Sequence, residues 1–248
     1  MNRLKEQHLF IHISQTDSTN KYLQLFSENE TTPSGSIVLA DYQTAGRGQI
    51  HNSWESEAEQ NLTFSIYFCP ENVPANMPFV ISEMVSLSIK YTLDKYIADI
   101  SIKWPNDIYY KDNKIAGILI ENTISDIFIE KSIIGIGLNI NQTKFISNAP
   151  NPVSMALATG HSFERLIIIN EFHEIFSQQS ERLNNSCFNS IHNEYIKSLY
   201  RKEGYHKYAD IDGIFEASIY DIEPTGQLVL ERSNGTLSKY TFKEVIFC

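Results

Sequence analysis

Residues Ile102–Glu121 read IKWPNDIYYKDNKIAGILIE, and this stretch decides which kind of sheet the chain builds. Pro105 cannot donate to a strand ladder, so it ends the strand before it. Two apolar runs, Ile108–Tyr110 and Ile115–Glu121, flank the polar turn Lys111–Lys114 and predict a hairpin. Hairpins in place of a strict alternation of strand and helix favour an α+β fold over a doubly wound parallel sheet.

The segments on either side of the hairpin supply further strands and helices. Leu62–Phe68 alternates apolar and polar side chains, which predicts a half-buried strand. Met77–Ile97 carries apolar residues at helical spacing and predicts a long helix against the sheet. The other predicted strands are Ile11–Ser14, Ser36–Tyr42, Ile102–Trp104 and Phe128–Ile140, and the other helices run from Asp17 or Ser18 to Phe26 and through Phe163–Tyr200.

The end of the chain has a different pattern. Lys207–Phe247 consists of short strands with turns at Asp212-Gly213, Pro224–Gly226 and Asn234-Gly235. We therefore predict two domains. Residues 1–203 form a mixed, largely antiparallel sheet backed by helices, and residues 204–248 form a small β domain.

Length and charge limit the possible partners. The chain has 248 residues, of which 42% are hydrophobic, as in a well-cored globular protein. With 30 acidic against 20 basic side chains the formal net charge is −10, so the surface as a whole repels nucleic acid and anionic membranes. Neither is expected as a partner, and any basic site must be local.

The cysteines and the N-terminal residues indicate the compartment. Cys69, Cys187 and Cys248 are far apart, odd in number and without metal-ligand spacing, which argues for a reducing compartment and against a disulfide framework or a zinc site. Met1–His12 lacks the uninterrupted apolar core of a signal peptide, and no stretch is long and apolar enough to span a bilayer. We expect a cytoplasmic protein.

Two short motifs carry chemistry. Thr44–Gln49 reads TAGRGQ, in which the glycines let the backbone approach an anion closely and Arg47 supplies charge and forked donors. Lys103–Asp107 reads KWPND where a strand is predicted to end, and a further lysine follows at Lys114. Together they suggest phosphate handling beside an activated acyl group.

A third motif, Gly135–Asn139, reads GIGLN and resembles part of a dinucleotide-binding fingerprint. It lacks the third glycine and no convincing helix follows, so we do not expect NAD to bind. Its glycines instead allow a backbone or a ligand to pack closely against a strand.

Six blocks of this sequence occur in the order found in biotin-protein ligases, the family that the chain resembles. They are Asp17–Asn20, Gln43–Gly48, Trp54, Lys103–Asp107, Lys114–Leu119 and Gly135–Asn141. The blocks span most of the first 141 residues, and the tail resembles the small C-terminal domain of that family. The resemblance implies a biotin/lipoyl ligase-like catalytic domain followed by an SH3-like β-barrel domain.

The resemblance implies a reaction of two steps. Biotin and ATP, with Mg²⁺, give biotinyl-5'-AMP and pyrophosphate, and a lysine of a biotin carboxyl carrier protein then takes the biotinyl group. The biotin carboxylate and ATP are both anions, so in a dry site they repel each other strongly unless cations intervene. By the resemblance Lys114, Arg47 and Asp107 are the catalytic residues, with Lys114 at the carboxylate-phosphate junction and Arg47 on the phosphate.

A substrate-binding site is implied in the same way. The residues implied to contact biotin are Ser18 and Thr19 at the ureido group, Gln43 beside it, and Gly117 and Leu119 along the tail. Trp54 covers the adenylate or the tail, and Asn139 reads adenine. The remaining implied binding residues are Asn20, Gly46, Gly48, Gln49, Lys103, Asn106 and Gly137.

Asp107 has two possible roles, and both stay open. As a carboxylate close to an amine nucleophile it accepts the proton, because an amine must be neutral to attack. As a Mg²⁺ ligand it would act with Asn106 and would need further partners that the sequence does not identify.

These residues also have ordinary structural explanations. Arg47 by itself would be a surface arginine, Lys114 a solvated lysine in a turn, and Asn106-Asp107 a turn that ends a strand. Ser18 can cap a helix while it contacts a ligand, and Trp54 can be a core residue. The register with the family favours the functional explanations.

Two departures from the family pattern matter. Gln49 follows Gly48 where many members carry arginine or glycine, so the loop has one cation fewer near the adenylate. The catalytic pattern starts within the first twenty residues, so we expect no winged helix-turn-helix domain, no DNA binding, and a monofunctional monomer or homodimer. The alternatives are a lipoate- or octanoate-protein ligase on the same scaffold, which the GRG and KWPND blocks fit poorly, and a non-catalytic biotin- or adenylate-binding sensor.

Overall fold

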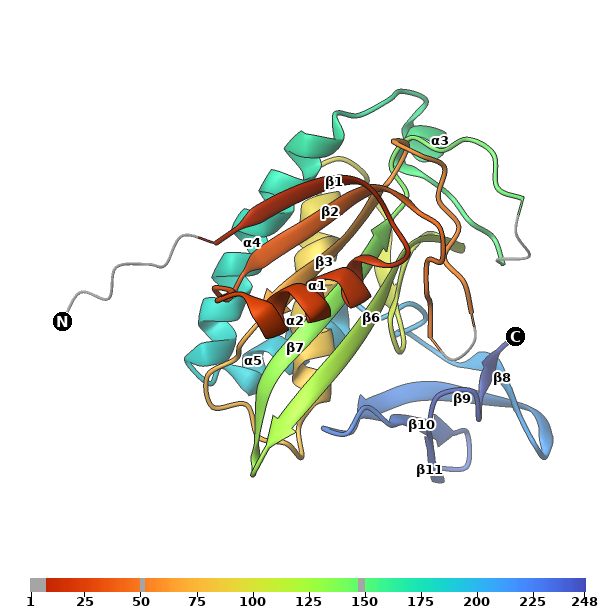
Figure 1. Ribbon diagram of the computed structural model, residues 1–248. Coiled ribbons are helices and arrows are strands. Elements are labelled where there is room, and N and C mark those ends of the chain that lie inside the picture. Colours follow the sequence, from red (N-terminus) through yellow and green to blue (C-terminus); the bar gives the residue numbers. More distant parts are fainter. Residues whose placement is uncertain (1–7, 50–51, 147–149) are drawn as a thin grey trace.

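A seven-stranded sheet forms the centre of the molecule (Figure 1). The computed structural model describes residues 8–49, 52–146 and 150–248. The strands are β1 (Phe10–Thr16), β2 (Ser36–Gln43), β3 (Leu62–Phe68), β4 (Ile100–Lys103), β5 (Asp107–Tyr110), β6 (Asn113–Ser125) and β7 (Phe128–Leu138), in the order β1-β2-β3-β7-β6-β5-β4. Strands β1 and β2 are parallel, whereas the other neighbours are antiparallel. This confirms the predicted mixed, largely antiparallel sheet.

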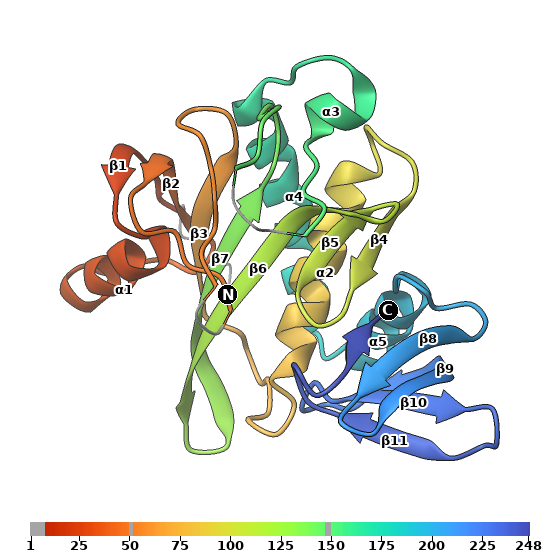
Figure 2. The same ribbon diagram turned by 90° about the vertical axis from the view of Figure 1, so that its right-hand side faces the viewer.

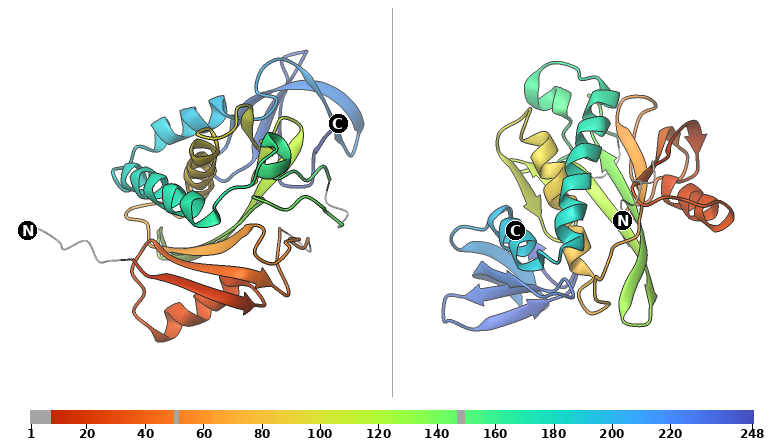
Figure 3. Two further views of the ribbon diagram at one scale, coloured as in Figure 1. Left: turned by 90° about the horizontal axis from the view of Figure 1, so that it is seen from above. Right: turned by 90° about the vertical axis from the view of Figure 1, so that its left-hand side faces the viewer.

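Helices cover both faces of this sheet. Helix α1 (Thr19–Asn29) packs on one face against β2, β3 and β7, and α2 (Phe79–Leu93), α4 (Arg165–Asn184) and α5 (Phe188–Lys197) lie on the other face (Figure 3). Edge-to-face ring contacts join β3 to α4, with Phe64 against Phe172 and Phe68 against Phe176. Burying each such ring stabilises the fold by about 1.5–3 kcal/mol.

Helices on both faces explain why one prediction was wrong. The strand Leu62–Phe68 is not half-buried, because Thr63 and Ser65, on its polar face, are buried beneath α1. Strand β3 is therefore inside the molecule, and its polar residues find partners there: Thr63 Oγ1 donates to the Ala40 carbonyl at 2.9 Å.

Several element boundaries also differ from the predicted ones. The helix predicted over Met77–Ile97 is the shorter α2, and the predicted helical segment Phe163–Tyr200 is broken into α4 and α5, with Ser186 at φ 57° between them. The short helix α3 (Met155–Thr159) was not predicted. In the hairpin, β6 begins at Asn113, within the predicted turn, and continues to Ser125.

A second, antiparallel sheet is formed by the end of the chain and lies beside α5 (Figure 2). Its strands are β8 (His206–Asp210), β9 (Gly213–Ile222), β10 (Leu228–Arg232), β11 (Leu237–Tyr240) and β12 (Ile246–Phe247), in the order β11-β10-β9-β8-β12. We call these strands the C-terminal sheet, and they fit an SH3-like fold. The sheet begins close to the predicted domain boundary between residues 203 and 204, which stays a prediction.

No helix among the described residues is long and apolar enough to cross a membrane. The prediction for the N-terminal stretch Met1–His12 falls largely on residues 1–7, which lie outside the described residues.

Candidate active site

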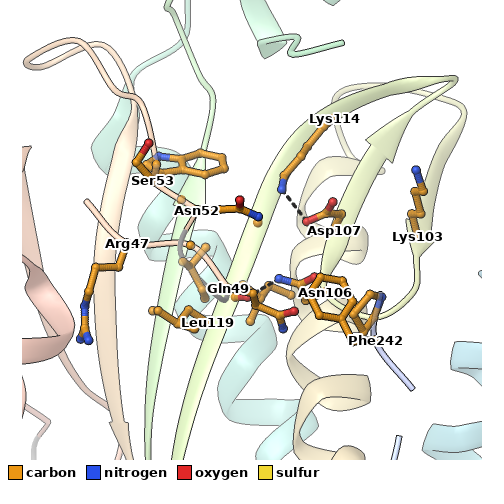
Figure 4. Close-up of a pocket in the computed structure, with 18 of the residues that line it drawn as sticks. Arg47, Gln49, Asn52, Ser53, Lys103, Asn106, Asp107, Lys114, Leu119 and Phe242 are labelled. Carbon is orange, nitrogen blue, oxygen red and sulfur yellow. Dashed lines mark hydrogen bonds and ion pairs between the residues drawn. The ribbon is translucent and has the colours of Figure 1, made fainter. Parts of the chain in front are cut away.

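A cavity of about 460 Å³ opens at the end of the large sheet where the loops after β2 and β4 meet (Figure 4). The first turn of α1, the loop after β2, the KWPND turn, β6 and β7 surround it, and one wall comes from residues 242–247 next to the C-terminal sheet. Its predicted lining residues are Ser18, Thr19, Asn20, Gln43, Arg47, Gly48, Gln49, Trp54, Lys103, Asn106, Asp107, Lys114, Gly117, Leu119 and Gly137. The fold thus gathers segments that are far apart in the sequence into one site.

One end of the cavity is a buried set of neutral donors and acceptors at the start of α1. Ser18 occupies the N-cap position without a side-chain cap hydrogen bond, so its hydroxyl is not used for capping. The Gln43 Oε1 atom instead accepts from the backbone N–H of Thr19 at 2.7 Å. Ser65 Oγ donates to Asn20 Oδ1 at 2.6 Å and lies 2.7 Å from Thr19 Oγ1. Such fixed neutral groups suit the polar head of an uncharged ligand.

Glycines on β6 and β7 let two side chains lie directly against the sheet. A Cβ atom at Gly137 would lie 2.2 Å from Cε2 of Trp54, and one at Gly117 would lie 3.1 Å from Cζ3 of the same ring. At Gly135 a Cβ atom would lie 2.3 Å from Oδ1 of Asn20. The GIGLN motif therefore allows close packing, as predicted, and the groups that approach are side chains.

Lys114 and Asp107 form an ion pair on the neighbouring strands β5 and β6. Lys114 Nζ lies 2.6 Å from Asp107 Oδ1, and both side chains are about three-quarters buried, with 25% and 22% exposed. Backbone bonds to the segment 151–153 fix Lys114 on its other side: its N–H donates to the Asn151 carbonyl at 2.8 Å, and its carbonyl accepts from Val153 at 2.9 Å. The amine is therefore presented from a strand clamped along both edges.

Lys103 is a second, half-buried lysine of the cavity. Its Nζ atom donates to the Tyr109 hydroxyl at 3.0 Å and lies over the rings of Tyr109 and Phe247, at 4.8 and 5.2 Å from their centroids. No carboxylate in the described part of the chain lies within ion-pair distance of it. Burial lowers the pKa of Lys103. An anion in the cavity would compensate this charge.

Arg47 points away from Lys114 in Figure 4. Its Nη2 atom lies 3.3 Å from Glu121 Oε2, in a pair whose side chains are 47% and 41% exposed. The same Glu121 oxygen accepts from Asn20 Nδ2 at 2.7 Å. The structure thus places Arg47 at the rim of the cavity and does not bring it to the Lys114–Asp107 pair. An ion pair this exposed contributes at most about 1 kcal/mol, so it is easily exchanged for another partner.

Two predicted binding residues do not line the cavity. Gly46 holds the loop after β2 together, because its carbonyl accepts from the Trp54 N–H at 2.9 Å and a Cβ atom there would lie 2.7 Å from the Trp54 carbonyl oxygen. Asn139 is buried and its Nδ2 atom donates to the Val153 carbonyl at 3.0 Å, whereas its Oδ1 atom has no hydrogen-bond partner among the described residues.

Several residues of the site lie outside the predicted set. Asn52 and Ser53 line the cavity across from Lys114, Phe242 and Phe247 form its C-terminal wall, and Ser65 and Glu121 bind its lining residues. Ser65 could have been found from the polar face of Leu62–Phe68, had that face been placed under a helix. Phe242 and Phe247 belong to no recognisable motif, since their position at the cavity depends on how the C-terminal sheet packs against the rest of the protein.

Comparisons with known proteins agree with this geometry. The model of the biotin/lipoate A/B protein ligase family matches residues 12–139. Over 243 residues, the chain is 26% identical to the bifunctional ligase/repressor BirA of Bacillus subtilis, with 95% of this chain and 73% of that protein covered. It is 27% identical to the biotin--[acetyl-CoA-carboxylase] ligase of Paracoccus denitrificans, covering 90% of this chain and 94% of that one.

A solved structure has the same fold. The biotin protein ligase of Aquifex aeolicus, in complex with biotin and ATP, matches with a TM-score of 0.77 at 21% identity and covers 96% of this chain and 97% of that one. This likeness extends through both sheets.

Proposed function

Because the chain belongs to the biotin/lipoate A/B protein ligase family, we propose that it is a biotin-protein ligase. It activates biotin with ATP to biotinyl-5'-AMP and transfers the biotinyl group to a lysine of a biotin carboxyl carrier protein. One observation carries the proposal: the Lys114–Asp107 pair lies in one cavity with a buried neutral pocket at one end and, at the other, Lys103, which has no ion-pair partner among the described residues. That is the layout a neutral head group and a polyphosphate require.

In the first step the biotin carboxylate attacks the α-phosphorus and pyrophosphate leaves. With the ureido group among Ser18, Thr19 and Gln43, the valeryl tail runs past Gly117 and Leu119 and brings its carboxylate toward Lys114. The Lys114 ammonium then donates to oxygens of both reacting anions. One such preorganised charged donor contributes about 3–4 kcal/mol to stabilising the transition state.

The leaving pyrophosphate lies on the Lys103 side of the cavity. A half-buried ammonium with no carboxylate partner in the described chain binds an anion strongly, because charge-assisted hydrogen bonds strengthen as water is excluded. Arg47 exchanges Glu121 for the α-phosphate of the adenylate and so closes the loop after β2 over it.

The residues around Asp107 fit a Mg²⁺ ion bound together with ATP. Asp107 Oδ1 is buried and lacks a well-directed hydrogen bond despite its closeness to Lys114, and Asn106 is its neighbour at the cavity wall. No cluster of three or more His, Cys, Asp or Glu side chains among the described residues forms a metal cage. Mg²⁺ typically binds through one or two carboxylates, substrate phosphates and water, and it neutralises phosphate charge.

In the second step the ε-amine of the carrier lysine attacks the acyl carbon, an amide bond forms, and AMP leaves. The amine must lose a proton to attack. Asp107 is the carboxylate of the cavity closest to the junction, and it accepts this proton once Lys114 has turned to the phosphate.

Adenine recognition falls to Asn139. Its buried Oδ1 atom has no hydrogen-bond partner among the described residues, and such an acceptor is costly to leave unpaired. The exocyclic amine of adenine would supply the donor. The indole N–H of Trp54, which lines the cavity, is likewise buried without a partner among the described residues and could donate to the nucleotide.

Pyrophosphate release tests the proposal directly. The protein is incubated with ATP and either biotin or lipoate, and the carrier domain is then added. We expect biotin-dependent release and biotinylation of the carrier by the wild type, and neither by Lys114→Ala. Release with lipoate but not with biotin would identify a lipoate ligase instead, and tight biotin binding without any release would identify a sensor.

The cellular setting follows from the same proposal. The carrier is the proposed protein partner, and with a net charge of −10 we expect neither DNA nor membranes as partners. The free cysteines predict a cytoplasmic location, and a monomer or homodimer is predicted.

A further inference from the structure

A histidine connects three elements far from the cavity. His192, on α5, places Nδ1 2.7 Å from Glu83 Oε1 of α2 and Nε2 2.8 Å from Asp221 Oδ1 of β9. Glu83 is 3% exposed, so a carboxylate has been placed within the helical layer. The imidazole thus joins the buried side of α2 to the C-terminal sheet, and we call this contact the His192 link.

The geometry of these contacts favours the positively charged form of the His192 ring. A neutral imidazole has one N–H and can donate to only one of two carboxylates, which would leave a lone pair facing the other. Two contacts below 3 Å to two carboxylates are satisfied together when both nitrogens donate, as in the imidazolium. His192 is a cation held between two anions.

The surroundings support the charged form. Glu83 from α2 and Asp221 from β9 face the ring directly, and Tyr195, on α5 itself, is a fully buried phenol near Glu83. The hydrogen bond to Glu83 is the main cause that raises the pKa of His192 to about 9. Burial raises the pKa of Glu83, whereas the hydrogen bond from His192 lowers it and so favours the carboxylate.

The link lies next to the turn that supports the cavity wall. Asp221 is close in sequence to Pro224–Gly226, whose carbonyls accept from the Phe79 N–H at 3.2 Å and from the Trp104 indole Nε1–H at 2.8 Å. Trp104 belongs to the KWPND turn, and its ring contacts Phe242 of the wall at 6.4 Å between centroids. The wall and the KWPND turn are therefore connected through the Pro224–Gly226 turn, which lies next to the His192 contact.

We propose that His192 is a positioning residue that, as an imidazolium, anchors the C-terminal sheet so that its 242–247 segment completes the nucleotide end of the cavity. This rests on the proposed function. No hydrogen bond given for the described residues joins the biotin end, around Ser18 and Gln43, to this wall. Loss of the link therefore affects ATP and spares biotin.

The two tryptophans of the chain give a test that needs no activity. The Trp104 indole N–H is hydrogen-bonded to Gly226, whereas that of Trp54 is not bonded, so their two indole signals can be followed separately by ¹H–¹⁵N NMR, with Trp104→Phe for assignment. In His192→Gln we expect a shifted Trp104 signal and hydrogen exchange about tenfold faster, with Trp54 unchanged. An unchanged Trp104 signal in the folded variant would overturn the proposal.

Kinetics provide the second test. We expect His192→Gln to raise the KM for ATP about three- to tenfold and to leave the KM for biotin within about twofold. The ratio of the variant's ATP KM to that of wild type should fall toward one above about pH 9, because the wild type has then lost the same charge. A ratio that stays constant with pH, or equal changes in both KM values, would contradict the proposal.

A histidine of the C-terminal sheet provides a matched control for His192→Gln. His206 bonds only to a backbone carbonyl, that of Glu203 at 2.8 Å, so His206→Gln should behave as wild type in every measurement. If wild type and His206→Gln release no pyrophosphate with biotin, the proposed function fails, and the Trp104 signal still decides the anchoring role of His192.

Discussion

At the scale of single residues, the absence of a side chain at Gly137 is as important as any charge in the site. A Cβ atom there would lie 2.2 Å from the Trp54 ring, closer than any real contact. We expect Gly137→Ala to displace Trp54 and to weaken binding of biotinyl-AMP by about 1–3 kcal/mol, the usual cost of overpacking. Titration calorimetry with biotin plus ATP checks this.

Gly117→Ala serves as the graded comparison for Gly137→Ala. The nearest atom of Trp54 would be 3.1 Å away and the nearest atom of Lys114 3.3 Å away, distances that small shifts of the ring and of the flexible lysine relieve. A larger loss at position 117 than at 137 would contradict the expectation that contact with the Trp54 ring decides the loss.

Lys103 gives a second prediction at this scale. Because its ammonium would compensate the leaving pyrophosphate, Lys103→Gln should raise the KM for ATP by about tenfold or more, as expected for loss of a charged hydrogen bond of about 1.5–3 kcal/mol. Burial lowers the pKa of Lys103, so this lysine loses its charge at a lower pH than an ordinary lysine does. The wild-type KM for ATP should therefore begin to rise at that lower pH.

The control for Lys103 is an exposed lysine beside a ring. Lys111 lies over Tyr110, 5.1 Å from its centroid, and does not line the cavity. Steady-state kinetics of Lys111→Gln should match the wild type, and a similar rise in KM for both variants would point to a general effect of surface charge.

The residues of the site could be predicted only where a motif marked them. Lys114 and Asp107 stand in recognisable blocks, and the structure brings them together. Glu121 belongs to no motif, because its role depends on the side chain of Arg47, with which it forms an ion pair. The buried amide of Asn139 could not be placed either, since a backbone partner from the segment after β7 decides its orientation.

At the scale of elements, the loop between β2 and β3 is built to change partners. Its backbone is closed by bonds from Gly48 to Asn52 at 2.7 Å and from Trp54 to Gly46 at 2.9 Å, whereas the side chain of Arg47 pairs, among the described residues, with the exposed Glu121. We expect biotin plus ATP to slow amide hydrogen exchange in residues 44–49 and 52–54 well beyond biotin alone, because biotin alone offers Arg47 no phosphate.

Arg47→Ala is the matching variant for the loop. It should bind biotin and lose the additional protection by ATP, with faster release of biotinyl-AMP. Equal protection of the loop in wild type and Arg47→Ala would show that Arg47 does not close it.

Helices and strands could be predicted from the sequence where local sequence signals and tertiary packing favour the same structure. The hairpin β5–β6 was predicted because Pro105 and a polar turn delimit it, and the period of two identified β3. The depth of β3 could not be predicted, because burial of Thr63 and Ser65 requires α1 to pack on their face. The five-residue helix α3 was missed because a single turn capped by Ser154 carries too short a pattern.

At the scale of the whole molecule, the link through His192 makes stability depend on pH. The unfolded histidine has a pKa of about 6.5, and the folded one is raised to about 9. Its stabilisation is therefore complete below about pH 6.5 and is lost as the pH rises through about 9. We expect a loss on the order of 1–2 kcal/mol, less than the shift alone implies, because the imidazole is partly exposed.

Thermal unfolding between pH 6 and pH 10 measures this effect. The wild type should lose more stability across the range than His192→Gln, which lacks the titrating group. Parallel curves for the two proteins would mean that other groups cause the alkaline loss.

The position of strand β12 at the cavity allows a fluorescent label to be attached next to it. Cys248 is exposed and follows Phe247, which lines the cavity. Once the other exposed thiol, Cys187, is replaced by serine, a maleimide dye would attach preferentially to Cys248, since Cys69 is partly covered. Its emission would then report nucleotide entry in real time, without labelled substrate and without altering a lysine or arginine of the site.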